Sequence, residues 1–146
     1  MRLFLLILMT ALQGCTASPA QEKEGSLQVG EYLYEALGDE KLAGIGDELP
    51  ECIRVISDDN GLREIANLTD TEEIAAAAEL FKAVQIGKKT DIYVTDRYNS
   101  VSFTFADGEK TVITLNDRNL EWKNNDTTEL YELEGMNDFW KSIFQD

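Results

Sequence analysis

The chain has 146 residues, of which 43% are hydrophobic and 28% are charged. This composition is typical of one ordinary globular domain, and it disfavours a disordered chain, a collagen-like repeat and a multi-pass membrane protein. The 28 acidic side chains outnumber the 13 basic ones, so the formal net charge is −15. Such a charge repels the phosphates of nucleic acids, and we expect no nucleic-acid partner.

The first fourteen residues are typical of a secretory signal. Arg2 supplies one positive charge, and the stretch from Leu3 to Leu12 is apolar except for Thr10. A transmembrane helix needs about 20 apolar residues, so this stretch is too short to span a bilayer. A charged start, a short apolar run and a small residue before a cleavage site together predict a signal peptide.

The stretch Leu12, Gln13, Gly14 and Cys15 resembles the lipobox of bacterial lipoproteins. In that family the peptidase cuts before the cysteine, which becomes the diacylated first residue of the mature chain. The resemblance implies a signal peptide over residues 1–14, acyl chains such as palmitate on Cys15, and a position at the cell membrane on its extracytoplasmic face. More than one acyl chain anchors a protein stably. The alternative is an ordinary secretory signal cut nearby, with Cys15 incidental.

Residues 15–26 form the predicted lipidated tether, because they are small and polar and include Pro19. We expect one α+β domain over residues 27–146, with a core over about residues 51–144. The first part of this domain, residues 27–49, permits either a strand or a short helix. Three glycines interrupt any long element there: Gly38, Gly44 and Gly46.

The next segment predicts a β-hairpin. Residues 52–56 and 62–68 have the composition of strands, and Asp-Asp-Asn-Gly between them is a strong turn signal. A calcium-binding loop is the alternative interpretation of this acidic turn. That loop needs an acidic ligand where this chain has Ile56, and a glutamate where it has Asn67. The turn is therefore the favoured interpretation.

A capped helix follows the hairpin. It opens over residues 69–73, where either Thr69 or Asp70 can cap it, each with a glutamate three residues later. We expect Gly87, with the two lysines that follow it, to stop the helix. One apolar stripe at helical spacing predicts the buried face: Ile74, Ala77, Leu80, Phe81 and Val84.

Alternating apolar and polar residues over 100–105 and 111–115 predict a second hairpin. A two-residue loop would turn Ile113 to the wrong face of the sheet. A three-residue loop over 106–108 instead pairs Val101 with Ile113, and it places a glycine at the left-handed position that such a loop requires. The three-residue loop is therefore predicted.

Two short strands and a helix complete the domain. Leu120 and Trp122 share one strand face, and residues 129–133 form a further strand. Apolar residues at helical spacing predict the last helix: Met136, Phe139, Trp140 and Ile143. The predicted class is α+β, with a small antiparallel sheet of hairpins, one central amphipathic helix and a short C-terminal helix. This order resembles small extracytoplasmic domains of Firmicutes lipoproteins, a resemblance that implies a fold class but no site residues.

The sequence offers no catalytic, cofactor-binding or metal-binding residues. It has no histidine and no glycine-rich phosphate loop after a strand. Cys52 is the only cysteine after Cys15, and it is typical of a buried strand residue rather than a nucleophile. Trp122 and Trp140 are candidate platforms for stacking a carbohydrate, but each is in phase with an apolar face. Both are therefore expected in the core.

The expected function is that of a lipid-anchored extracytoplasmic binding or accessory module. We expect no enzymatic activity and no cofactor. The expected partners are the membrane, through the lipid anchor, and an unknown envelope or secreted protein. One alternative is an inhibitor or immunity-type lipoprotein, since a compact acidic domain suits a basic target. A second alternative is a carboxylate-dependent envelope hydrolase, because acid pairs alone can serve glycoside hydrolysis.

Overall fold

The computed structural model of the protein describes residues 26–144. The predicted signal peptide, the lipobox with Cys15 and nearly all of the tether lie outside the described residues. Among residues 26–144, no helix combines the length and the hydropathy needed to cross a membrane.

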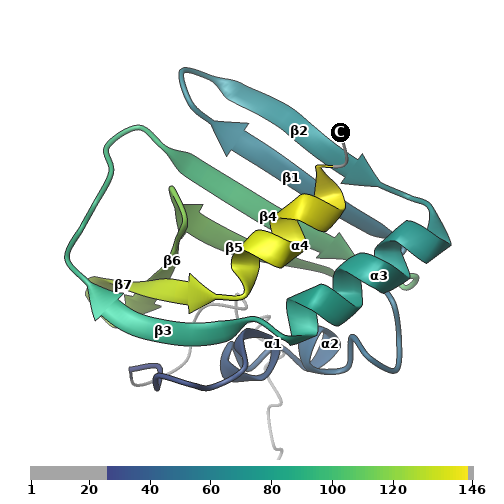
Figure 1. Cartoon of the computed structure of the whole chain (residues 1–146), viewed down its shortest axis with the longest axis horizontal. Coiled ribbons are helices and arrows are strands. Elements are labelled where there is room, and N and C mark those ends of the chain that lie inside the picture. The colour runs from purple at the N-terminus through teal and green to yellow at the C-terminus, as the bar shows by residue number, and fades with distance from the viewer. Residues whose placement is uncertain (1–25, 145–146) are drawn as a thin grey trace, which may run out of the picture.

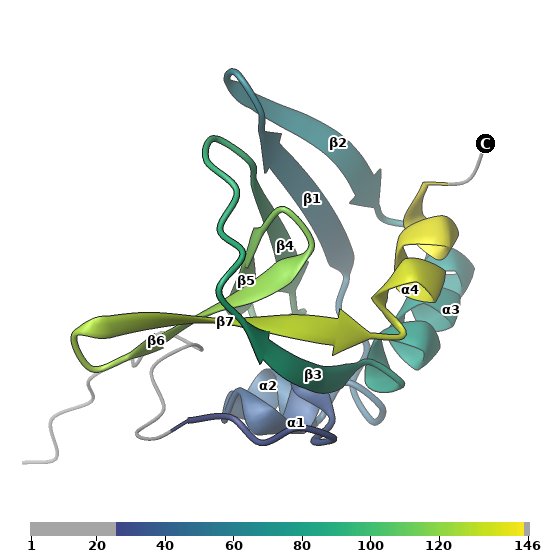
Figure 2. The same ribbon diagram turned by 60° about the vertical axis from the view of Figure 1, so that its left-hand side comes forward.

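One seven-stranded sheet organises the described chain, and its neighbouring strands are antiparallel in the order β2-β1-β4-β5-β6-β7-β3 (Figure 1). The strands are β1 (Cys52–Asp58), β2 (Leu62–Leu68), β3 (Gln85–Thr90), β4 (Tyr98–Thr104), β5 (Lys110–Asn116), β6 (Asn119–Asn124) and β7 (Thr127–Glu134). The helices are α1 (Leu33–Ala36), α2 (Glu40–Ala43), α3 (Thr71–Lys82) and α4 (Met136–Ile143). The sheet curls, so that β6 and β7 run across the direction of β1 and β2 (Figure 2).

The core lies between the sheet and the helices α3 and α4, which contact each other over one face (Figures 1 and 2). Phe81 of α3 packs on Phe103 of β4, with ring centroids 4.8 Å apart, and on Phe139 of α4, with centroids 5.3 Å apart. Val101 and Ile113 are fully buried in the same cluster, as predicted. The α+β class is confirmed, with strands dominating. A single central helix is not confirmed, because α4 shares the face with α3.

Both predicted hairpins are confirmed. The strands β1 and β2 pair across the acidic turn. In the second hairpin Val101 pairs with Ile113 and Phe103 pairs with Thr111, as the three-residue loop requires. Gly108 has a φ of 84°. This left-handed conformation is strained for other residues, and it is why the loop needs glycine.

The helix α3 begins where a cap was predicted but ends earlier than expected. Of the two candidate caps, Asp70 is the N-cap, and its carboxylate accepts hydrogen bonds from two backbone N–H groups at 3.0 and 3.1 Å. The prediction that Gly87 stops the helix is wrong, because α3 already ends at Lys82 and Ala83 is its C-cap. The chain then enters β3, a strand that was not predicted.

Gly87 instead allows two strands to approach closely. It lies where the pairing of β3 with β7 shifts register, between Ile86 and Lys89. A Cβ at this position would lie 2.8 Å from the backbone oxygen of Glu132. A glycine inside a strand commonly marks such a bulge or close approach, and here it does both.

Residues 27–49 contain two single-turn helices, α1 and α2, preceded by a turn at Val29 and Gly30 and a bridge from Tyr32 to Gln85. The backbone N–H of Leu33 donates to the carbonyl of Val84 at 2.9 Å, so this stretch is held beside the start of β3. The core therefore extends beyond the predicted range 51–144, because apolar side chains of the first segment join it. They are Leu27, Leu33, Ala36, Leu37, Leu42 and Ile45.

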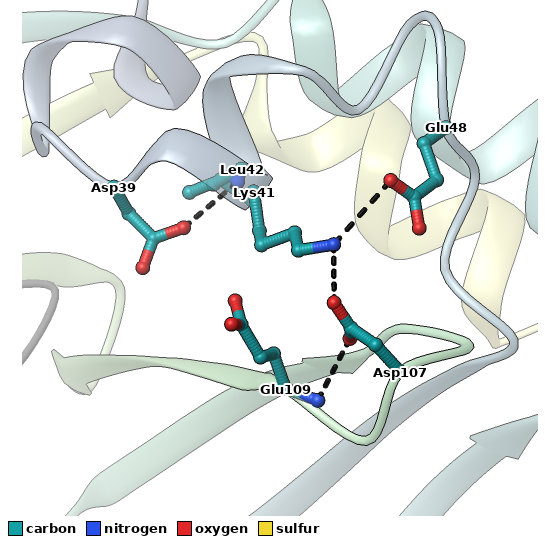
Figure 3. A network of polar contacts seen from close by, with 6 residues as sticks. All are labelled: Asp39, Lys41, Leu42, Glu48, Asp107 and Glu109. Atoms are coloured by element: carbon teal, nitrogen blue, oxygen red, sulfur yellow. Dashed lines mark hydrogen bonds and ion pairs between the residues drawn. The ribbon is translucent and has the colours of Figure 1, made fainter.

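Lys41 of α2 ties this first segment to the loop between β4 and β5 (Figure 3). Its Nζ lies 2.5 Å from the carboxylate of Asp107 and 3.4 Å from that of Glu48. The bond to Lys41 is the main cause that holds the pKa of Asp107 below its ordinary value, and the backbone N–H of Glu109 adds to it. All these groups are partly exposed, so the network fixes geometry more than it contributes free energy.

Candidate functional site

Residues 91–97 carry the chain from β3 at one edge of the sheet to β4 near its middle, past three strands. The buried amide of Asn116 holds this crossing segment. Its Nδ2 donates to the carbonyl of Val94 and its Oδ1 accepts from the N–H of Val94, both at 2.8 Å. A buried amide with both groups paired fixes the backbone beside it. The segment begins at one hollow of the surface and ends at another.

The Trp140 hollow is a depression of about 180 Å³ between β2, α4 and the turn from β5 to β6. Trp140 and Phe144 form one aromatic wall, with stacked rings whose centroids are 5.6 Å apart and whose planes are inclined by 20°. Phe144 is 40% exposed and Trp140 is half-buried. The lining residues are Ile65, Asn99, Asp117, Arg118, Trp140 and Phe144.

A β-bulge supplies an apolar side chain to this hollow. Val55 pairs with Ala66 and Ile56 pairs with Glu64, which leaves Ile65 as an extra residue in β2. Bulges bend a strand and redirect a side chain. The bulge therefore explains why Ile65 lines the Trp140 hollow although it lies in an edge strand.

The polar hollow, of about 310 Å³, adjoins the Trp140 hollow because Asn99 and Asp117 line both. Its other lining residues are Ser57, Asp59 and Arg97. The Nδ2 of Asn99 donates to the carbonyl of Asp117 at 2.9 Å, and the N–H of Asp117 donates to the carbonyl of Arg97 at 2.7 Å. The wall that the two hollows share is therefore held by hydrogen bonds to the backbone.

Two arginines line these adjoining hollows. Arg97 and Arg118 are exposed, and neither forms an ion pair with any residue of the described range 26–144. Each guanidinium presents five N–H donors in a planar fork that suits carboxylates. Asp59 and Asp117 line the same hollows, so the joint lining is formally neutral in a chain whose net charge is −15.

The charged hollow, of about 320 Å³, lies against β3, β6 and β7, and its lining includes Lys89, Asp91, Tyr93, Glu121 and Glu129. Its central groups satisfy one another. The Nζ of Lys89 lies 2.8 Å from one oxygen of Glu129, and a nearby tyrosine hydroxyl, of Tyr131, donates to the other at 2.7 Å.

Protonation in the charged hollow follows from these contacts. The bond from Lys89 is the largest cause of a lowered pKa at Glu129, and the bond from Tyr131 is the next. Glu129 in turn raises the pKa of Lys89. A hydrolytic general acid needs a raised pKa, so the geometry suits Glu129 to a structural role. The neighbouring Oε2 of Glu121 is buried, and no described residue donates a hydrogen bond to it.

The residues singled out in the sequence fall in different places. Trp122 is fully buried, as predicted, whereas Trp140 is half-buried and lines a hollow. Cys52 is half-buried rather than buried, because it alternates with the core residue Ile53 and so faces the other side of the sheet. Its thiol donates to the Oδ1 of Asn67 at 3.1 Å.

The acidic turn between β1 and β2 is a turn by its backbone geometry, since Asn60 has a φ of 63° and Gly61 a φ of 125°. Within residues 26–144, no group of three or more Asp, Glu, His or Cys side chains is placed to hold a metal ion.

Sequence reasoning missed Asn99, Asp117 and both arginines of the adjoining hollows. The only local signal is that Asp117 and Arg118 lie in the short turn between β5 and β6. Their proximity to α4 depends on how the whole sheet curls. Comparison of the chain with protein-family models, with curated proteins and with solved structures found no match.

Proposed function

We propose that the protein is a lipid-anchored binding or accessory module at the cell membrane, on its extracytoplasmic face, with no catalytic activity of its own. Cys15 carries the anchor, behind the lipobox residues Leu12, Gln13 and Gly14. The domain holds a component of the cell envelope at the Trp140 hollow and the polar hollow beside it.

One observation supports binding at this place. The aromatic wall of Trp140 and Phe144 is partly exposed and adjoins two arginines without ion partners among the described residues. Binding sites combine an apolar surface with a few polar groups that fix orientation. Partly exposed aromatic side chains contribute large contact areas to such sites.

The anchor is tested by mass and by fractionation. In a bacterial host that lipidates proteins, the mature chain should lose residues 1–14 and gain the mass of acyl chains. A Cys15→Ser chain should leave the membrane fraction. The proposal of a lipid anchor is wrong if the Cys15→Ser chain remains in the membrane fraction to the same extent as the unmutated chain.

Binding is tested by co-sedimentation of the purified full-length protein with insoluble envelope material from bacteria. A Phe144→Ala variant should bind at least several-fold less, because it removes half of the aromatic wall. Tyr93→Ala is the matched control, since Tyr93 is also an exposed aromatic residue but lines the charged hollow. Equal loss in both variants, or none in either, would contradict the assignment of the site.

The absence of catalysis is tested by screening envelope glycans and peptides for turnover. The two carboxyl groups to vary are Glu121 and Glu129, which line one hollow. We expect no turnover by the unmutated protein. Turnover that disappears in Glu121→Gln or Glu129→Gln would instead establish a carboxylate-dependent hydrolase.

A further inference from the structure

We infer that the Trp140 hollow and the polar hollow together bind an acidic glycan, with one sugar ring on the aromatic wall and a sugar carboxylate at the arginines. This inference rests on the proposed function, because it names the class of ligand for the same site. It commits to a carbohydrate that carries carboxylates.

The aromatic wall selects for a ligand with a flat apolar face. Trp140 and Phe144 are stacked and partly exposed, and Ile65 extends the apolar surface. One face of a pyranose ring carries mostly C–H groups, and it packs on such a wall. The remaining groups of the ring are hydroxyls, which need hydrogen-bond partners around the wall.

The polar groups supply those partners. Asn99 and Asp117 line both hollows, and Ser57 and Asp59 line the polar hollow. Carboxylates and amide oxygens accept hydrogen bonds from hydroxyls, and a serine hydroxyl both donates and accepts. The two hollows adjoin, so a chain of at least two sugar residues can occupy both, one beside the aromatic wall and the next among the polar groups.

The arginines select for negative charge on the ligand. Arg97 lines the polar hollow and Arg118 lines the Trp140 hollow, each without an ion pair inside residues 26–144. A guanidinium binds a carboxylate through two parallel hydrogen bonds. Asp59 and Asp117 offset these charges, so the lining is neutral and repels an anion far less than the acidic chain as a whole.

The test uses one glycan in two forms. The purified full-length protein is titrated with a tetrasaccharide of alternating glucuronate and N-acetylglucosamine, and with the same tetrasaccharide after reduction of its carboxyl groups. The acidic form should bind roughly tenfold more tightly, because it adds charge-assisted hydrogen bonds to the arginines. The preference should shrink as salt is raised, since the arginines are exposed.

Three arginine variants test which arginines cause the preference for the acidic form. Arg97→Gln and Arg118→Gln should each bind the two forms more equally, with little change for the reduced form. Arg63→Gln is the matched control, because Arg63 is also exposed and forms no ion pair in the described chain, but does not line either hollow. It should keep the full preference.

The outcomes separate this inference from the proposed function. Equal binding of both forms, still lost in Phe144→Ala, overturns the acidic ligand but leaves a binding module at this site. No binding of either form overturns the glycan as ligand. The proposed function is then decided separately, by the co-sedimentation experiment with envelope material. A preference that survives in both Arg97→Gln and Arg118→Gln also overturns the inference.

Discussion

In the charged hollow Lys89 pairs with Glu129, which also accepts a hydrogen bond from the nearby Tyr131, whereas in the Trp140 hollow Arg118 has no ion partner within the described chain. The first set of groups joins three parts of the fold, because Ser26 also donates to Glu129, at 3.4 Å. Arg118 instead borders the aromatic wall of Trp140 and Phe144, which is partly exposed.

The difference indicates how one acidic chain divides its few basic side chains. Lys89 pairs with Glu129, and this pair stabilises the place where Ser26 contacts the domain. Arg97 and Arg118 form no ion pair with residues 26–144, so their guanidinium groups are open to a ligand. Changes near the charged hollow should therefore alter stability, while changes at Arg97 or Arg118 should alter binding.

The largest expected effect is that of a substitution in β3, the strand that carries Lys89. Gly87→Val should destabilise the protein by about 3 kcal/mol or more, because its Cβ meets the backbone of Glu132 and overpacking forces the strands apart. The measurement is urea unfolding. Gly44→Ala is the control, since a Cβ there lies 3.4 Å from the nearest atom and should cost little. Similar stabilities of the two variants would contradict the close approach of β3 and β7.

A somewhat smaller effect is expected at the loop between β4 and β5, away from the charged hollow. Gly108→Val should destabilise by roughly 1–3 kcal/mol, because a β-branched residue resists a positive φ. A Cβ at Gly108 meets no atom within 4 Å, so the expected loss comes from backbone strain rather than from a clash of the Cβ. Thermal melting measures the effect. An unchanged melting temperature would mean that the loop has another conformation.

These two glycines show which parts of the fold the sequence predicts. The Gly108 loop follows from local alternation, since only one loop length keeps Val101 and Ile113 on one face. Gly87 was misassigned because its role depends on Glu132, which is distant in sequence. A strand of six residues with two lysines, β3, has no clear alternation, so pairing with β7 decides its structure.

The candidate site was predictable only in part. Trp140 was recognised as a possible stacking platform, but its helical phase indicated the core, and the structure leaves it half-buried at the rim. Asn99 and Arg118 carry no pattern of their own. They line one hollow with Trp140 because the sheet curls and α4 packs across it, and no local sequence period encodes this arrangement.

A third prediction tests the paired charges directly. Glu129→Gln should cost about 1 kcal/mol at pH 7, because it weakens the bonds to Lys89 and Tyr131. The folded pKa of Glu129 is lowered, so its contribution is present above the ordinary glutamate pKa of about 4.3 and is lost as the pH falls through the folded value.

The measurement for this prediction is the difference in unfolding free energy between the unmutated protein and Glu129→Gln, from pH 7 to pH 3. The difference should be constant near neutral pH and should close in acid. Glu79→Gln is the control, because Glu79 forms an exposed pair with Lys82 and should show a difference close to zero throughout. A Glu129 difference that does not change with pH would show that the pair contributes no charge-dependent stability.

The smallest expected effect is that of chelator and reductant, which should leave the melting temperature nearly unchanged. A chain that begins at Ser26 should fold without metal or disulfide, because the core cluster starts at Leu27 and is contiguous. In the charged hollow Lys89 supplies the positive charge that Glu129 needs, so no cation is required there. Glu121 is the residue at which a bound cation would contradict this prediction, because its buried Oε2 accepts no hydrogen bond from the described residues. A drop of many degrees under chelator, reversed by added calcium and absent in Glu121→Gln, would show that a cation rather than Lys89 balances this hollow, and the contrast between the two hollows would then fail.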